Sequence, residues 1–130
     1  MPDRTARTVR TIETLALVAI GGFAGSNLRF FVGGLLSDPA ALLAVNTAGS
    51  VGLGFLLYEA RYSAIVSERT HAVVATGFLS SFTTYSTFAL TSLRLGLAGI
   101  GFVAVGYALG FAGVLAGRRV ALAVDRRGWR

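Results

Sequence analysis

Four long apolar stretches follow one another along the chain, separated by short polar connectors. We place their approximate boundaries at residues 12–36, 40–59, 71–93 and 95–117. Each stretch is close to the roughly 20 residues of helix needed to cross the hydrocarbon layer of a membrane. The pattern therefore predicts an all-α membrane protein with four transmembrane helices, built as a single transmembrane domain over residues 1–130.

The composition agrees with a membrane location and narrows the function classes. Of the 130 residues, 54% are hydrophobic and only 14% are charged, more apolar surface than a soluble domain of this size could bury. The chain has no cysteine, which excludes disulfides and thiolate metal sites. No pairing of a nucleophile with a base and no phosphate-binding loop is recognisable, so we do not expect an enzyme.

The charge pattern predicts the orientation of the chain. The net charge of +6 comes from arginines gathered in the basic tails 1–11 and 118–130. Arginines that flank spans are more often orientation signals and lipid-headgroup contacts than nucleic-acid sites, so we expect lipid as a partner and no nucleic acid. The two tails and the middle connector hold three, five and two arginines, whereas the opposite side holds Arg94 and, at most, Arg29. Both termini are therefore expected in the cytoplasm, with the chain in the cell membrane.

Glycines predict how the helices pack. Gly106, Gly110, Gly113 and Gly117 recur at intervals of four, three and four, and so share one face of the last helix. Small faces let helix backbones approach in lipid, where hydrophobicity does not drive association. The spacing leaves open whether these faces meet within one chain or between chains.

Two polar residues inside the first two stretches are candidates for function. Arg29 is either an arginine that extends to the interface or a fixed positive charge at the mouth of an anion pathway. Asn46 offers two N–H donors, for which a hydrogen bond between helices is the commoner use.

The third stretch contains an unusual cluster of hydroxyl residues between Ser80 and Phe88. Serine and threonine can bond back to their own backbone and bend or open a helix. An opened helix exposes carbonyls, which can hold a cation where they are shielded from lipid. Tyr85 and Phe88 are three residues apart and present rings on one face. Their positive edges could face an anion, although ordinary core packing is the alternative.

These residues resemble the Fluc family of fluoride channels, also called CrcB, over roughly residues 14–117. The motifs that carry the resemblance are Gly21-Gly22-x-x-Gly25-x-x-x-Arg29, Asn46-Thr47-x-Gly49-Ser50 with Gly54, and Gly77-Phe78-x-x-x-x-Thr83-Thr84-Tyr85-Ser86-Thr87-Phe88. The resemblance implies an antiparallel dimer, with itself or with a paralogue, and two fluoride pathways along the subunit interface. It also implies a third helix broken mid-membrane and a structural sodium ion at the dimer axis, held by the backbone carbonyls of Ser80 and Thr83.

The resemblance also implies roles for the remaining candidates. Asn46 would be the pore-lining donor, with Thr84 and Ser86 also in the pathway, and Arg29 would sit by the aqueous vestibule. Tyr85 and Phe88 would stand where the family has its two pore phenylalanines. Transport would be passive fluoride export that protects the cell from fluoride toxicity. Fluoride is small and strongly hydrated, so losing its water requires donors such as an amide, hydroxyls and ring edges.

The sequence departs from the family pattern at a few positions. Tyr85 replaces a phenylalanine, Ser80-Ser81 stands where a glycine pair is usual, Thr91 replaces an acidic residue and Phe111 a small hydroxyl residue. The strong arginine asymmetry is also unusual, because a homodimer of antiparallel chains needs one chain inserted both ways. We therefore expect one fixed orientation and an oppositely oriented paralogue as the partner.

Two other functions remain as alternatives. A small four-helix exporter of organic cations would need a mid-membrane carboxylate, and no acidic residue lies in the interior of any stretch. A structural subunit for membrane assembly would explain the glycine faces, but not the combination of Asn46 with the cluster from Ser80 to Phe88.

Overall fold

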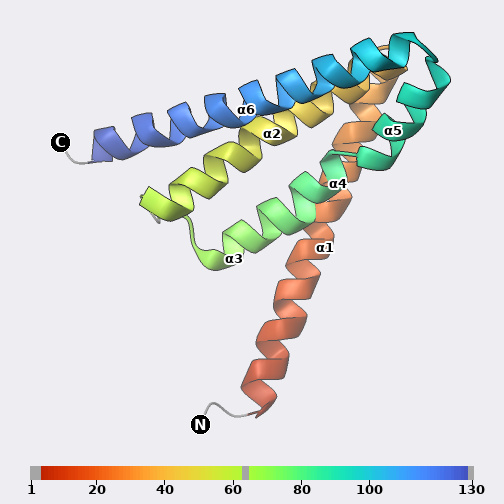
Figure 1. Ribbon diagram of the computed structural model, residues 1–130. Coiled ribbons are helices and arrows are strands. Elements are labelled where there is room, and N and C mark those ends of the chain that lie inside the picture. The colour runs from red at the N-terminus through yellow and green to blue at the C-terminus, as the bar shows by residue number, and fades with distance from the viewer. Residues whose placement is uncertain (1–3, 63–64, 129–130) are drawn as a thin grey trace.

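The computed structural model describes residues 4–62 and 65–128, and this part of the chain is helical without β-strands (Figure 1). The helices are α1 (Arg4–Leu35), α2 (Asp38–Tyr62), α3 (Glu68–His71), the π-helical segment η1 (Ala72–Leu79), α4 (Ser80–Phe82), α5 (Tyr85–Arg94) and α6 (Ala98–Gly128). The all-α prediction is confirmed.

Three helices, α1, α2 and α6, are each long and apolar enough to cross a membrane. At about 1.5 Å per residue, the 32 residues of α1 extend well beyond a hydrocarbon layer of about 30 Å. Residues 4–11 and 118–128, which the sequence assigns to basic tails, continue α1 and α6 as helix. The remaining tail residues, 1–3 and 129–130, lie outside the described part of the chain.

The helices form two packed groups that diverge from a common end. Helix α2 lies against α6, whereas α1 lies against η1 and α4 (Figure 1). The α1–α2 and α5–α6 turns lie near that common end, and the described ends of the chain lie away from it. Arg94, in the last turn of α5, is therefore far from the arginines at the start of α1.

Glycines make the closest helix contacts possible. A Cβ atom added at Gly54 would collide with the Val114 carbonyl, and one at Gly117 would collide with the Val51 carbonyl. The glycine face predicted for the last helix therefore packs against α2 of the same chain. On the other side of the molecule, Gly25 of α1 lies directly against the Phe78 carbonyl of η1.

A glycine also makes the turn from α5 to α6. Gly96 has a φ of 58°, a left-handed conformation that side chains rarely tolerate. Its N–H donates to the Leu93 carbonyl at 3.2 Å, which ends α5 and lets the chain reverse into α6.

A buried carboxylate fixes the connector between α2 and α3. Glu59 is only 2% exposed and accepts hydrogen bonds from the backbone N–H groups of Ile65 and Val66, at 2.6 and 2.8 Å. Its second oxygen lies 2.9 Å from Nε2 of His71. The connector is therefore held by polar contacts at the end of a membrane helix.

Candidate functional site

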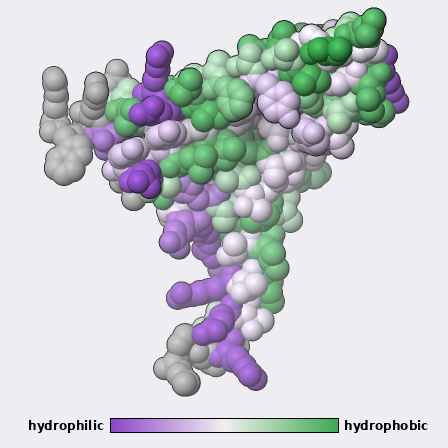
Figure 2. Space-filling model, in the orientation of Figure 1, coloured by the Kyte–Doolittle hydropathy of each residue, from purple (hydrophilic) through white to green (hydrophobic). Residues whose placement is uncertain are grey.

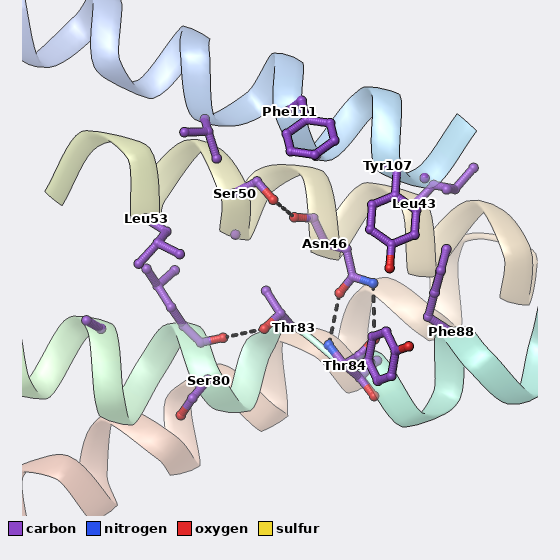
Figure 3. Close-up of a pocket in the computed structure, with 17 residues that line it drawn as sticks. Leu43, Asn46, Ser50, Leu53, Ser80, Thr83, Thr84, Phe88, Tyr107 and Phe111 are labelled. Atoms are coloured by element: carbon purple, nitrogen blue, oxygen red, sulfur yellow. Dashed lines mark hydrogen bonds between the residues drawn. The ribbon is translucent and has the colours of Figure 1, made fainter. Parts of the chain in front are cut away.

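A cavity of about 550 Å³ lies between α2 and α6 on one side and η1, α4 and α5 on the other (Figure 3). It brings together most of the sequence candidates, and further polar and aromatic side chains line it as well. The candidates on its wall are Asn46, Ser80, Thr83, Thr84, Tyr85 and Phe88. The wall also includes the polar or aromatic residues Ser50, Tyr107 and Phe111. Ser86 is exposed and Arg29 half-buried, and neither is among the residues on the wall.

The chain is extended where it passes the cavity. Helix α4 ends at Phe82, and Thr83 and Thr84 adopt extended conformations, with φ/ψ of −84°/160° and −150°/121°. Thr84 then caps α5, because its Oγ1 accepts the Thr87 N–H at 3.3 Å and donates to the Thr87 hydroxyl at 3.0 Å. The hydroxyl cluster thus supplies the cap that starts a new helix after the interruption.

Asn46 of α2 holds this extended segment with both ends of its amide. Its Oδ1 accepts the Thr84 N–H at 2.9 Å, and its Nδ2 donates to the Thr84 carbonyl at 3.1 Å (Figure 3). Ser50, one turn later, donates its hydroxyl to the Asn46 carbonyl at 2.9 Å. One Nδ2–H of Asn46 has no partner among the described residues, so it remains available to a ligand in the cavity.

The interruption removes the helical donors of the carbonyls just before it, including those of Ser80 and Thr83. In a continuous α-helix the Thr84 N–H would bond to the Ser80 carbonyl, and the Thr87 N–H to the Thr83 carbonyl. Here the first donates to Asn46 and the second to the Thr84 hydroxyl. The carbonyls of Ser80 and Thr83 thereby gain lone pairs that can serve other partners.

Arg29 already bonds to one of these two carbonyls. Its Nη1 donates to the Thr83 carbonyl at 3.2 Å, across 54 positions of sequence. A half-buried guanidinium therefore contacts the extended segment through the Thr83 carbonyl and places a positive charge beside it. Among the described residues that line the cavity itself, none is acidic or basic.

The groups gathered here are of two chemical kinds, one suited to a small anion and the other to a cation. Amide, hydroxyl and ring-edge groups present partial positive charge to an anion, whereas exposed carbonyl oxygens suit a hard cation such as sodium.

Comparison with known proteins identifies the family. Residues 16–118 match the model of the CrcB-like proteins, described as camphor resistance (CrcB). A relative from Haloarcula marismortui, named fluoride-specific ion channel FluC 1, is 49% identical over 80% of this chain and 82% of its own length. FluC 2 of Halobacterium salinarum is 47% identical over 86% of this chain and 91% of its own, and FluC 1 of Methanospirillum hungatei is 36% identical over 88% and 81%.

This chain belongs to the CrcB family. The match covers α2, η1, α4 and α5 entirely and α6 as far as residue 118, and so includes every residue on the wall of the cavity. The resemblance drawn from the sequence motifs is confirmed.

The aromatic side chains of this CrcB protein differ in their surroundings. Phe88 is 8% exposed and packs into a core with Leu42 and Phe102, its ring centroid 5.0 Å from that of Phe102. Tyr107 meets Phe88 edge-on, with centroids 6.4 Å apart and an interplanar angle of 85°. Tyr85, in contrast, is 74% exposed at the margin of the cavity.

Sequence reasoning did not assign Tyr107 and Ser50 to the site. Tyr107 is the only side chain in the last apolar stretch that combines a ring with a hydroxyl, and Ser50 is one turn from Asn46. Those signals were present in the sequence. Whether these two residues belong to the site depends on the packing of α6 against α2, which turns Tyr107 toward Asn46 and Phe88 (Figure 3).

Proposed function

We propose that this chain forms a fluoride-selective channel that lets fluoride leave the cell passively and so protects it from fluoride toxicity. The observation that carries the proposal is the Asn46 amide, fixed on the Thr84 backbone with one N–H left over at the cavity wall. The relatives from Haloarcula marismortui and Halobacterium salinarum are named fluoride-specific ion channels. The chain accordingly acts as a channel and not as an enzyme.

The chemistry of the cavity supports selection of fluoride. A fixed donor that has already lost its rotational freedom binds a small anion without a further ordering cost. Tyr107 and Phe88 add a hydroxyl and ring edges close to Asn46. Larger halides, which hold their water less tightly, gain less from such closely spaced donors and are hindered by a narrow aromatic path.

The interrupted segment provides the fourth span in this proposal. Helices η1, α4 and α5 together cover residues 72–94, about the length of one crossing, with the extended residues Thr83 and Thr84 at mid-membrane. Non-helical backbone at that depth requires shielding from lipid. An antiparallel partner lying over the cavity would supply the shielding and complete two fluoride pathways, with Thr84, Tyr85 and Ser86 along them.

The carbonyls freed by the interruption fit a structural sodium ion. Ser80 and Thr83 have both lost their helical donors, and unwound carbonyls are typical ligands of sodium in membrane proteins. Held there at the dimer axis, sodium would tie the two interrupted segments together.

The arginines favour one fixed orientation, with both termini cytoplasmic. Arg4, Arg7 and Arg10 at the start of α1, and the arginines at the end of α6, lie away from Arg94 in the fold. The charge asymmetry counted along the sequence is therefore also an asymmetry in space. A chain with a fixed orientation needs an oppositely oriented paralogue to form an antiparallel dimer; a chain that inserts both ways pairs with itself.

Fluoride efflux from liposomes containing the purified chain tests the function. We expect rapid passive efflux of fluoride and none of chloride. Uptake of an organic cation driven by a proton gradient, without fluoride efflux, would contradict the proposal in favour of an exporter. If the chain alone is silent, addition of a co-expressed paralogue separates a heterodimer from a failed function.

A further inference from the structure

The N-terminal part of α1, residues Arg4–Leu15, extends away from the rest of the molecule as a single helix (Figure 1). We call this segment the arm. Within the described residues, its one ion pair joins Glu13 to Arg69 near the base of the arm. Figure 2 shows hydrophilic residues gathered along one side of this projecting part of α1.

The arm is amphipathic. Arg4, Arg7 and Arg10 recur at intervals of three along one side. Val9, Ile12 and Leu15 form a second series displaced by five residues, which places each of them about 140° around the helix from the matching arginine. These three apolar side chains are 57%, 61% and 62% exposed, so no part of the described fold covers them.

Three threonines of the arm have hydroxyl groups that are satisfied within the helix. Thr8, Thr11 and Thr14 each donate a hydroxyl hydrogen bond to the carbonyl four residues earlier, at 3.0, 3.0 and 2.9 Å. These three hydroxyls therefore need no water, which lowers the cost of placing the helix where water is scarce. Glu13, the one acidic residue of the arm, is paired with Arg69, so the arginines dominate its charge.

From these observations we infer that the arm is a binding surface for anionic lipid headgroups. Its apolar side lies toward the acyl chains, and Arg4, Arg7 and Arg10 engage the phosphates of the same leaflet. Charge complementarity selects anionic over zwitterionic lipid. The arm is continuous with a membrane-crossing helix, so its base is already at the membrane surface. This inference does not depend on what the cavity conducts.

The chain has no cysteine, so a single Val9→Cys variant labels the arm alone. We would reconstitute it in phosphatidylcholine vesicles with or without phosphatidylglycerol and measure its reaction with a water-borne thiol reagent. Anionic lipid is expected to slow the reaction, by about fivefold for each arginine engaged. High salt should reverse the protection, because about 1 M salt shortens the screening length to about 3 Å.

The charge-neutral variant Arg4→Gln, Arg7→Gln, Arg10→Gln on the Val9→Cys background should lose the protection. Arg94→Gln, at the opposite end of the fold, is the control and should retain it. Equal reactivity of Val9→Cys in the two kinds of vesicle, or protection that survives the triple substitution, would overturn the inference. Circular dichroism of each variant separates loss of lipid binding from loss of helix.

Discussion

Asn46 and Thr84 exchange two hydrogen bonds, with the asparagine amide occupying the place that a neighbouring backbone would take in a sheet. The N–H and carbonyl of Thr84 are thereby satisfied although Thr84 belongs to no helix. A buried unpaired backbone group would cost about 1–3 kcal/mol. Asn46 therefore stabilises the interruption of the third apolar stretch and, in the same orientation, faces the cavity.

Replacing Asn46 separates these two tasks. Asn46→Asp keeps an oxygen for the Thr84 N–H but loses the donor and adds a negative charge. Fluoride efflux should fall by at least about 10- to 100-fold, the equivalent of one hydrogen bond to a charged group. Asn46→Ala should lose efflux as well and also melt at a lower temperature.

Asn27→Ala is the matched control, because the Asn27 amide is exposed and donates to the Phe23 carbonyl of its own helix at 2.7 Å. It should retain efflux and stability. Wild-type efflux in Asn46→Asp would show that Asn46 acts only as a backbone partner.

Arg29 offers a test of the proposed sodium site. Its guanidinium donates to the Thr83 carbonyl, so its charge lies a few ångströms from any cation bound to the same oxygen. Arg29→Gln should lower the sodium concentration that supports half of the maximal fluoride efflux. We expect a shift of roughly fivefold to tenfold, since a unit charge at about 4 Å contributes at least about 1 kcal/mol.

The measurement is fluoride efflux against sodium concentration, with potassium replacing sodium. A lower maximal efflux at an unchanged half-maximal sodium concentration would mean that Arg29 only supports the backbone.

Most of the candidate residues named from the sequence lie on the wall of the cavity, whereas the contacts among them could not be predicted. Apolar stretches and uncharged interiors are local properties, so the helices could be predicted directly. The chemistry of Ser80–Phe88 was likewise visible as an excess of hydroxyls. The contact of Arg29 with Thr83 spans 54 positions and depends on the packing of α1 against η1, which no local pattern encodes.

The aromatic side chains show the same limit. A spacing of three predicts that Tyr85 and Phe88 share a helix face, and both line the cavity. Their burial nevertheless differs widely, because Phe102 of α6 covers Phe88 and nothing in the described fold covers Tyr85. Burial depends on the neighbouring helix, and spacing within one helix cannot supply it.

Two glycines of α6 provide a matched pair for stability. A Cβ at Gly117 would collide with the Val51 carbonyl, whereas Gly101 has nothing within 4 Å. Gly117→Ala should push α6 away from α2 and destabilise the protein by about 1–3 kcal/mol, as overpacking does. Gly101→Ala should be neutral or stabilising by up to about 1 kcal/mol, because alanine favours helix.

Thermal unfolding in detergent compares the two variants directly. Equal melting temperatures would show that the α2–α6 contact can relax around an added methyl group. A loss for Gly101→Ala alone would indicate that this open position is covered by another chain.

We call the hydrogen bonds of the Glu59 side chain to Ile65, Val66 and His71 the clamp. Among the polar positions outside the cavity, Glu59 should be the one whose substitution lowers stability most. Its carboxylate accepts two backbone N–H groups and contacts His71, and almost none of it is exposed. Glu59→Gln preserves the shape but removes the charge that strengthens these bonds, which should cost about 1–3 kcal/mol. Glu68→Gln, at an exposed position of α3, is the control and should leave stability unchanged.

Limited proteolysis between α2 and α3 is the direct measurement, since loss of the clamp frees the connector before the membrane helices unfold. Faster cleavage of Glu59→Gln with unchanged fluoride efflux would show that the clamp stabilises the connector independently of the cavity, whereas equal cleavage of both variants would contradict its role.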